Sequence, residues 1–138
     1  MNELKIEAKA ENMAHVLAFV DECLEKLKCP MKIQMQIDIA VEELFINVAS
    51  YAYVPDTGDV MLQIDSDGES IFVTFIDSGV RFDPLARPDP DVTLAAEKRQ
   101  IGGLGIYMVK KSMDEMKYQR VDGQNILTIR KSMILPAK

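Results

Sequence analysis

Three glycines in four positions stand directly before an apolar helical pattern, in the segment IGGLGIYMVKKSMDEM that begins at residue 101. Glycine loses more backbone freedom on folding than any other residue, so Gly102, Gly103 and Gly105 need a structural reason. Backbone N–H groups at the start of a helix are unpaired and positive, which makes such a turn an anion site. A hinge or a simple helix entry would explain the same glycines. The segment is neither a dinucleotide fingerprint, because no βαβ unit surrounds it, nor a Walker A loop, because no Gly-Lys-Ser/Thr follows.

Apolar periodicity predicts the elements that precede this turn. LKIEAKA alternates apolar and polar residues as a strand does, and helical spacing predicts helices over about 12–27, with Asn12 as N-cap, and over about 32–52. VMLQIDS and SIFVTFID are predicted to be strands joined at Asp67-Gly68, the strongest hairpin signal in the chain.

The segment 78–103 is long and irregular, and such loops inside a compact domain are usually functional. A helix is expected over about 104–113, then a strand, a turn at Asp122-Gly123 and a last strand, NILTIRK. The order β-α-α-β-β-loop-α-β-β predicts an α+β two-layer sandwich over a single domain, 1–138, with one mixed β-sheet and helices on one face.

Net charge and hydropathy limit the classes of function that we expect for this protein. The formal net charge is -6 and the pI about 4.8, which disfavours direct binding of nucleic acid. No apolar run approaches the roughly 20 residues that span a bilayer, and the first residues lack a signal-peptide pattern, so we expect a cytoplasmic protein without a membrane partner. Cys23 and Cys29 fit no metal or redox spacing and are expected to be free thiols.

Glu43 and Asn47 lie four residues apart on the second predicted helix and therefore on one face of it, beside its core stripe. A carboxylate can accept a proton, and an amide oxygen can be a ligand of Mg²⁺. A solvated helix face is the simpler explanation of the pair taken alone.

Asp77 ends an apolar strand, and Gly79 follows two residues later. A carboxylate at a strand end can accept a hydrogen bond from the exocyclic amine of a purine, and a nearby glycine lets the backbone approach the ring. A plain Asp-Ser-Gly turn would explain the same residues. The order of the features is more informative than any one of them: a helix edge, a purine-reading carboxylate, a long loop and a phosphate-binding turn together describe an ATP site.

The segments VEELFINVASYAY, FIDSGVRFDP and GGLGIYMVKKSMDEM resemble the N box, G1 box and G2 box of the GHKL ATPase superfamily, and more narrowly those of the small anti-sigma factor serine/threonine kinases. The resemblance covers almost the whole chain. It implies the Bergerat ATP-binding fold, bound ATP with Mg²⁺, and a mobile ATP lid at roughly residues 83–101.

By position, the resemblance implies that Glu43 is the general base and Asn47 the Mg²⁺ ligand, and that Asp77 and Gly79 bind adenine. It also implies a phosphate loop and a lid, with roles for the following residues: Gly103 and Gly105 in the loop, Gly102 at the lid hinge, and the lid cations Lys98 and Arg99 near the γ-phosphoryl group. A solvated charged loop is an equally good explanation of the two cations.

Two positions depart from the superfamily pattern. Arg81 stands where many members carry a second glycine of the G1 box, and Tyr51 stands where a histidine often follows the N-box asparagine. The only histidine, His15, lies in a strongly apolar predicted helix, so the chain is not expected to be an autophosphorylating histidine kinase.

The resemblance implies that the protein sequesters a sigma factor and phosphorylates a small anti-anti-sigma (STAS) protein. It also implies a homodimer that uses the region of the first strand and helix. Two alternatives remain open from the residues: a nucleotide-gated protein-binding module that transfers no phosphoryl group, and a scaffold that binds no nucleotide.

Overall fold

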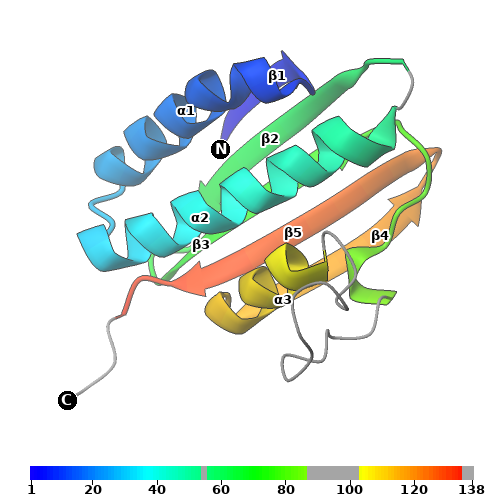
Figure 1. The fold of residues 1–138 in the computed structure, drawn as a ribbon. Coiled ribbons are helices and arrows are strands. Elements are labelled where there is room, and N and C mark those ends of the chain that lie inside the picture. The colour runs from blue at the N-terminus through cyan, green and yellow to red at the C-terminus, as the bar shows by residue number, and fades with distance from the viewer. Residues whose placement is uncertain (54–55, 87–102, 135–138) are drawn as a thin grey trace.

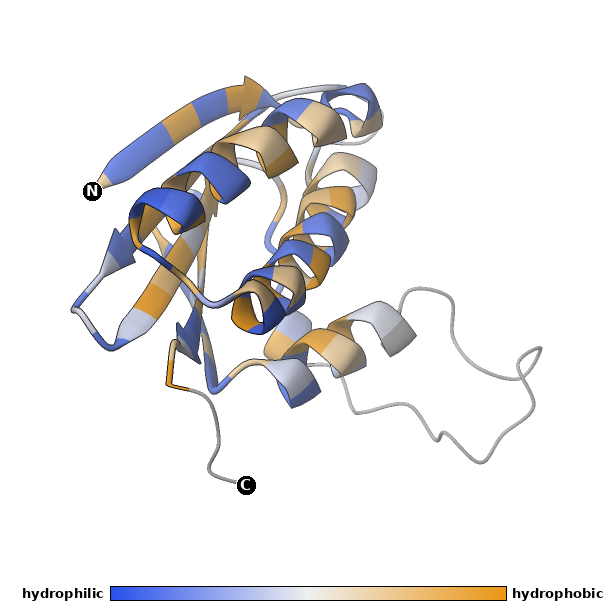
Figure 2. Cartoon of the chain, turned by 90° about the vertical axis from the view of Figure 1, so that its left-hand side faces the viewer, coloured by the Kyte–Doolittle hydropathy of each residue, from blue (hydrophilic) through white to orange (hydrophobic). Residues whose placement is uncertain are grey.

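Strands that alternate apolar and polar residues form one sheet with the order β1-β2-β3-β5-β4 in the computed structural model, which describes residues 1–53, 56–86 and 103–134 (Figure 1). The strands are β1 (Asn2–Glu7), β2 (Asp59–Ser66), β3 (Ser70–Asp77), β4 (Glu115–Val121) and β5 (Gln124–Ser132). The alternation is visible along β1 in Figure 2. One face of the sheet is therefore apolar and needs a cover.

Helices supply that cover and lie on one face of the sheet (Figure 1). They are α1 (Met13–Lys26), α2 (Met31–Asn47) and α3 (Gly103–Ser112), with single turns η1 (Ala10–Asn12), η2 (Val48–Ala52) and η3 (Pro84–Ala86). This arrangement confirms the predicted α+β two-layer sandwich. None of the described helices is long and apolar enough to cross a membrane.

The expectation of a mixed sheet is wrong for the described strands, because all four neighbouring pairs are antiparallel. β3 and β4, which are joined through α3, do run in the same direction. β5 lies between them in the sheet, however, and is antiparallel to both. Because β5 lies between β3 and β4, these two strands do not pair with each other, and the described strands form no parallel pair.

The core lies between α2 and the centre of the sheet. Phe45 of α2 and Phe75 of β3 are the largest fully buried side chains. Every second residue of β2, from Val60 through Leu62 to Ile64, is buried beneath the helices. Cys23 and Cys29 are free thiols, as expected.

Two local predictions need correction at the helix ends. The second helix does not run uniformly to residue 52, because its last turn, η2, is a π-helix. Asn12 precedes α1 but makes no capping bond, since its side-chain amide donates instead to the Glu7 carbonyl at 2.9 Å. The hairpin at Asp67-Gly68 is confirmed, with Gly68 at φ +94°.

A carboxyl pair joins the two N-terminal helices. Asp38 of α2 faces Asp21 of α1, and Asp21 also accepts a hydrogen bond of 3.0 Å from Gln34. Burial, a hydrogen bond with Asp21 and the charge of Asp21 raise the pKa of Asp38 to about 7, from an ordinary value of 3.8. The folded chain therefore holds a proton between these two pH values that the unfolded chain releases.

We expect stability to fall as pH rises from about 4 to about 7, because the unfolded chain binds fewer protons than the folded chain over this range. Asp38→Asn, whose amide can donate to Asp21 at every pH, should raise Tm at pH 8 by a few degrees and leave it nearly unchanged at pH 5. Thermal denaturation followed by circular dichroism at both values measures this. An equal change at pH 5 and pH 8 would contradict it.

Candidate functional site

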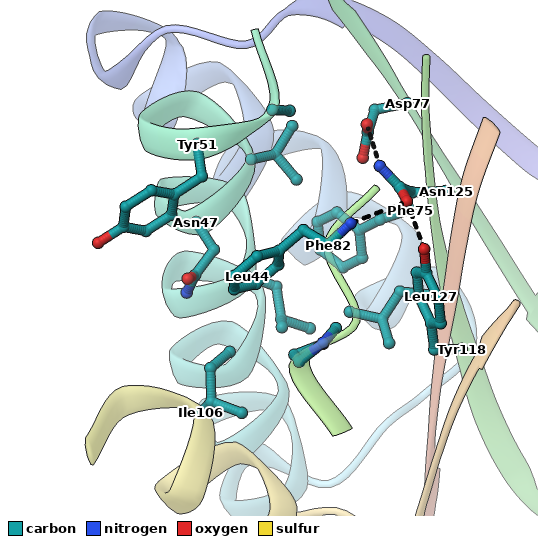
Figure 3. A pocket seen from close by; sticks show the side chains of 13 residues that line it. Leu44, Asn47, Tyr51, Phe75, Asp77, Phe82, Ile106, Tyr118, Asn125 and Leu127 are labelled. Carbon is teal, nitrogen blue, oxygen red and sulfur yellow. Dashed lines mark hydrogen bonds between the residues drawn. The ribbon is translucent and has the colours of Figure 1, made fainter. Parts of the chain in front are cut away.

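A cavity lies between the C-terminal half of α2 and the sheet, next to the end of β3 (Figure 3). Its apolar walls come from Leu44 of α2, Phe75 of β3, Ile106 of α3 and Leu127 of β5. Polar groups enter from two sides, Asn47 from the helix and the pair Asp77 and Asn125 from the sheet. Apolar walls with a few converging polar groups are typical of small-molecule sites.

Asp77 is the buried carboxylate of this cavity and is only 6% exposed. Its Oδ1 atom accepts hydrogen bonds of 2.9 Å from the backbone N–H of Gly79 and from the side-chain amide of Asn125. Among the described residues no group donates to Oδ2. One carboxylate oxygen is therefore held by the protein, and the other is available to a donor in the cavity.

Asn125 of β5 joins Asp77 to the loop after β3, and the sequence analysis did not identify this residue. It is 5% exposed, and its amide nitrogen donates to Asp77 Oδ1 and, at 2.8 Å, to the Val80 carbonyl. Its oxygen accepts bonds of 2.5 Å from the Tyr118 hydroxyl and 3.3 Å from the Phe82 N–H (Figure 3). The only signal was that Asn125 pairs with Asp77 across the sheet, and that register joins strands distant in sequence.

Gly79 lies where no side chain fits. A Cβ atom at this position would overlap the carbonyl oxygen of Ala52 at the end of η2, and the neighbouring Val80 N–H donates to the same oxygen at 2.8 Å. Arg120 fixes the loop from the other side by donating to the Gly79 carbonyl at 2.8 Å. The loop after β3 therefore packs against the π-helical turn η2. π-helical turns occur frequently at functional sites.

Glu43 lies next to Gly105 of α3 and is joined to Asn47 by a hydrogen bond within α2. The amide nitrogen of Asn47 donates to the Glu43 carbonyl at 2.8 Å, which leaves the amide oxygen for a ligand. A Cβ atom on Gly105 would overlap the Glu43 carboxylate, so a larger residue there would displace this side chain from its present position. Gly103 begins α3. The half-buried Glu43 carboxylate therefore lies at the predicted phosphate-binding turn.

Tyr51 and Phe82 form an aromatic pair at the mouth of the cavity. Their rings stack with centroids 5.7 Å apart and an angle of 16° between the planes. Tyr51 is 40% exposed and both rings line the cavity, so the pair separates its apolar interior from solvent.

Some predicted site residues lie outside the described residues: Lys98, Arg99 and Gly102, with the part of the expected lid from 87 to 101. Within the described ranges no three His, Cys, Asp or Glu side chains gather as metal ligands. His15 is exposed on α1.

Comparison with known proteins gives a consistent result. A family model described as a histidine kinase-like ATPase domain matches residues 6–131. The chain is 21% identical over 127 residues to a serine/threonine-protein kinase, BtrW, of Bordetella bronchiseptica, and covers 89% of it. It is 25% identical over 129 residues to a serine-protein kinase, RsbW, of Bacillus cereus, and covers 81% of it. Either alignment includes 91% of the present chain.

A solved structure shows the same fold. It contains the RsbU and RsbW domains of Rv1364c from Mycobacterium tuberculosis and superposes with a TM-score of 0.62 at 18% identity. The match includes 95% of the present chain and 32% of that longer chain, so the likeness concerns only one part of the longer chain.

We expect Asn125→Ala to destabilise the fold by about 2 kcal/mol or more, because it removes the hydrogen bonds by which the buried amide joins Asp77, Val80 and Tyr118. Tyr118→Phe, which removes one bond, should cost less. Urea denaturation measures the stability of both variants. Gln124→Ala, a change at the exposed neighbouring residue, is the control. Equal stability of Asn125→Ala and the control would show that this network does not hold the loop.

Proposed function

The chain belongs to the family of histidine kinase-like ATPase domains, and from this premise we propose that it binds ATP with Mg²⁺ and transfers the γ-phosphoryl group to a serine or threonine of a partner protein. The family match confirms the resemblance to the GHKL superfamily, and the names of the kinase relatives support the transfer reaction. The observation that carries the proposal is the cavity between α2 and the sheet, which Asp77 and Asn47 both line, with Glu43 one helical turn before Asn47.

The residues at the β3 end fit a purine. Asp77 presents Oδ2 to the exocyclic amine, and the close packing of Gly79 on Ala52 fixes the loop that holds Asp77 Oδ1. The apolar walls, including Leu44 and Phe75, exclude water from the base. These features favour adenine because its amine donates a hydrogen bond where the carbonyl of guanine would accept one.

The residues farther along α2 fit the phosphates. Glu43 and Ala52 are nine positions apart, roughly 13 Å along a helix axis, so residues of α2 toward Glu43 would hold the phosphates when the base is bound at the β3 end. The start of α3 presents backbone N–H groups to an anion there.

Asn47 and Glu43 have distinct roles in this proposal. The amide oxygen of Asn47 is available to hold Mg²⁺, while its nitrogen is occupied by the Glu43 carbonyl. An Mg²⁺ ion held there would neutralise charge on the phosphate oxygens. The Glu43 carboxylate accepts the proton of the attacking serine or threonine hydroxyl, and the lid cations Lys98 and Arg99 contact the transferred group.

We further propose the partners that the resemblance implies: a sigma factor that the protein sequesters, and an anti-anti-sigma STAS protein that carries the accepting hydroxyl. The names of the RsbW-like relatives support this assignment. A nucleotide-gated binding module would use the same site without transfer, and the two functions differ only in what Glu43 does. The protein is expected to act in the cytoplasm.

Asp77→Asn should abolish ATP binding, because the amide that replaces one oxygen presents a donor to the donating adenine amine. Isothermal titration of ATP with Mg²⁺ into the variant and the wild type measures this. Asp65→Asn changes an exposed carboxylate of β2 and should bind ATP as the wild type does. Wild-type protein that is folded and binds no ATP would refute the nucleotide site.

Glu43→Gln should retain ATP binding and lower phosphoryl transfer by about two to four decades, as loss of a general base does. The assay follows γ-labelled phosphate from ATP onto a panel of STAS proteins from the same genome. Glu25→Gln, an exposed change on α1, serves as the control. Transfer by Glu43→Gln at the wild-type rate would remove the assigned base, and ATP binding without transfer by the wild type would favour the binding module.

A further inference from the structure

The Tyr53 hydroxyl binds the loop that begins directly after Asp77. It accepts a hydrogen bond of 2.8 Å from the backbone N–H of Ser78. This N–H belongs to the peptide group that joins Asp77 to Ser78, and the next backbone N–H, that of Gly79, donates to Asp77 Oδ1. Tyr53 follows the π-helical turn η2 and lies outside the set of described residues that line the cavity. Its hydroxyl therefore acts on the backbone of the site and not on a ligand in the cavity.

The orientation of this hydroxyl is fixed by a second hydrogen bond. It donates to the backbone carbonyl of Asp59, the first residue of β2, at 2.6 Å. A hydroxyl has a single hydrogen, so donation to Asp59 leaves only its lone pairs to face Ser78. Burial raises the pKa of Tyr53 above its ordinary value of 10, and the hydrogen bond from Ser78 offsets this shift only in part. The hydroxyl thus remains a neutral donor at physiological pH.

Contacts of the aromatic ring also hold Tyr53 in place. The half-buried side chain packs against the hydrophobic core, and a Cβ atom on Gly58 would overlap its ring. Gly58 is itself fixed, because its carbonyl accepts a hydrogen bond of 2.8 Å from the N–H of Ala8, directly after β1. Tyr53 therefore reaches the loop after β3 from a position that the core and the start of β2 define.

Two kinds of contact hold Asp77. Asn125 and the Gly79 N–H bond directly to its Oδ1 atom, whereas Tyr53 holds the peptide group that follows the residue. With Oδ1 anchored, a rotation of that peptide group changes the direction in which Oδ2 points. Without the hydroxyl, the Ser78 N–H would bond to water and the peptide group could rotate. A group that is held in its binding orientation binds a ligand more tightly, because binding then costs less ordering.

We propose that Tyr53 is a positioning residue for the nucleobase, whose hydroxyl holds the peptide group between Asp77 and Ser78 so that Oδ2 faces the exocyclic amine. The inference rests on the proposed function, because it assigns a residue that orients the proposed base-binding carboxylate. Removal of the hydroxyl weakens the recognition of adenine. It leaves the phosphate-binding end unchanged, because the Tyr53 hydroxyl bonds to the loop after β3 and to β2, not to α2.

Tyr53→Phe tests the proposal, because it removes the hydroxyl and retains the ring. The affinity for ATP should fall about tenfold, the scale of one hydrogen bond, whereas the affinity for ITP should stay within about twofold of the wild-type value. The hypoxanthine ring of ITP presents a carbonyl where adenine presents an amine, so ITP gains nothing from a correctly oriented Oδ2. Competition against a fluorescent ATP analogue, with Mg²⁺ present, measures the Kd of both nucleotides.

Tyr107→Phe is the matched control, because it makes the same chemical change on α3, where the hydroxyl makes no hydrogen bond within the described ranges. It should leave both affinities unchanged. Gly58→Ala is a second variant, which retains the hydroxyl but displaces the Tyr53 ring, and it should also reduce the preference for ATP over ITP. Amide hydrogen exchange measured by NMR should be faster at Ser78 in Tyr53→Phe and unchanged there in Tyr107→Phe.

Circular dichroism confirms that each variant is folded, and Gly58→Ala keeps the test valid if Tyr53→Phe is not. Three results would overturn the inference and leave the proposed nucleotide site intact: wild-type affinity of Tyr53→Phe for ATP, an equal loss of affinity for ATP and ITP, or unchanged exchange at Ser78. Wild-type protein that is folded and binds no ATP would instead refute the proposed function, and the inference with it.

Discussion

The buried hydrogen bond between Asp77 and Asn125 is the contact on which the site depends. It joins the ends of β3 and β5, and through the other bonds of Asn125 it reaches Val80, Phe82 and Tyr118. A buried carboxylate needs partners to remain in place, and here the partner amide is itself satisfied on every side. The loop after β3 is therefore positioned by the sheet before any ligand arrives.

The helix α2 connects the Asp77–Asn125 pair and the loop after β3 to the rest of the site. The η2 turn that continues it accepts a hydrogen bond from the loop at the Ala52 carbonyl, and Glu43, near the C-terminal end of α2, lies next to Gly105 of α3. The same helix contributes Phe45 to the core. Because α2 and η2 form one continuous helical element, helix geometry sets the distance between Ala52 and Glu43, and with it the distance between the proposed base-binding and phosphate-binding ends.

Local patterns in the sequence were sufficient for part of this result. Glu43 and Asn47 could be placed on one face from their spacing, and Asp77 and Gly79 from the strand that they follow. Asn125 could not be found in this way, because its role arises from the pairing of β3 with β5, strands that are separated by α3 and β4. The π-helical turn and the pairing of Asp21 with Asp38 also depend on tertiary contacts, which local propensity does not encode.

The carboxyl pair between α1 and α2 has a consequence for the charge that the protein presents to its surroundings. A count of residues assigns a full negative charge to Asp38 at neutrality, but its pKa of about 7 leaves that carboxyl about half protonated in the folded state. Near neutrality this carboxyl alone therefore makes the native molecule less anionic than its composition states. Unfolding near pH 6 releases a proton to the solvent, so the enthalpy measured by calorimetry would vary with the ionisation enthalpy of the buffer.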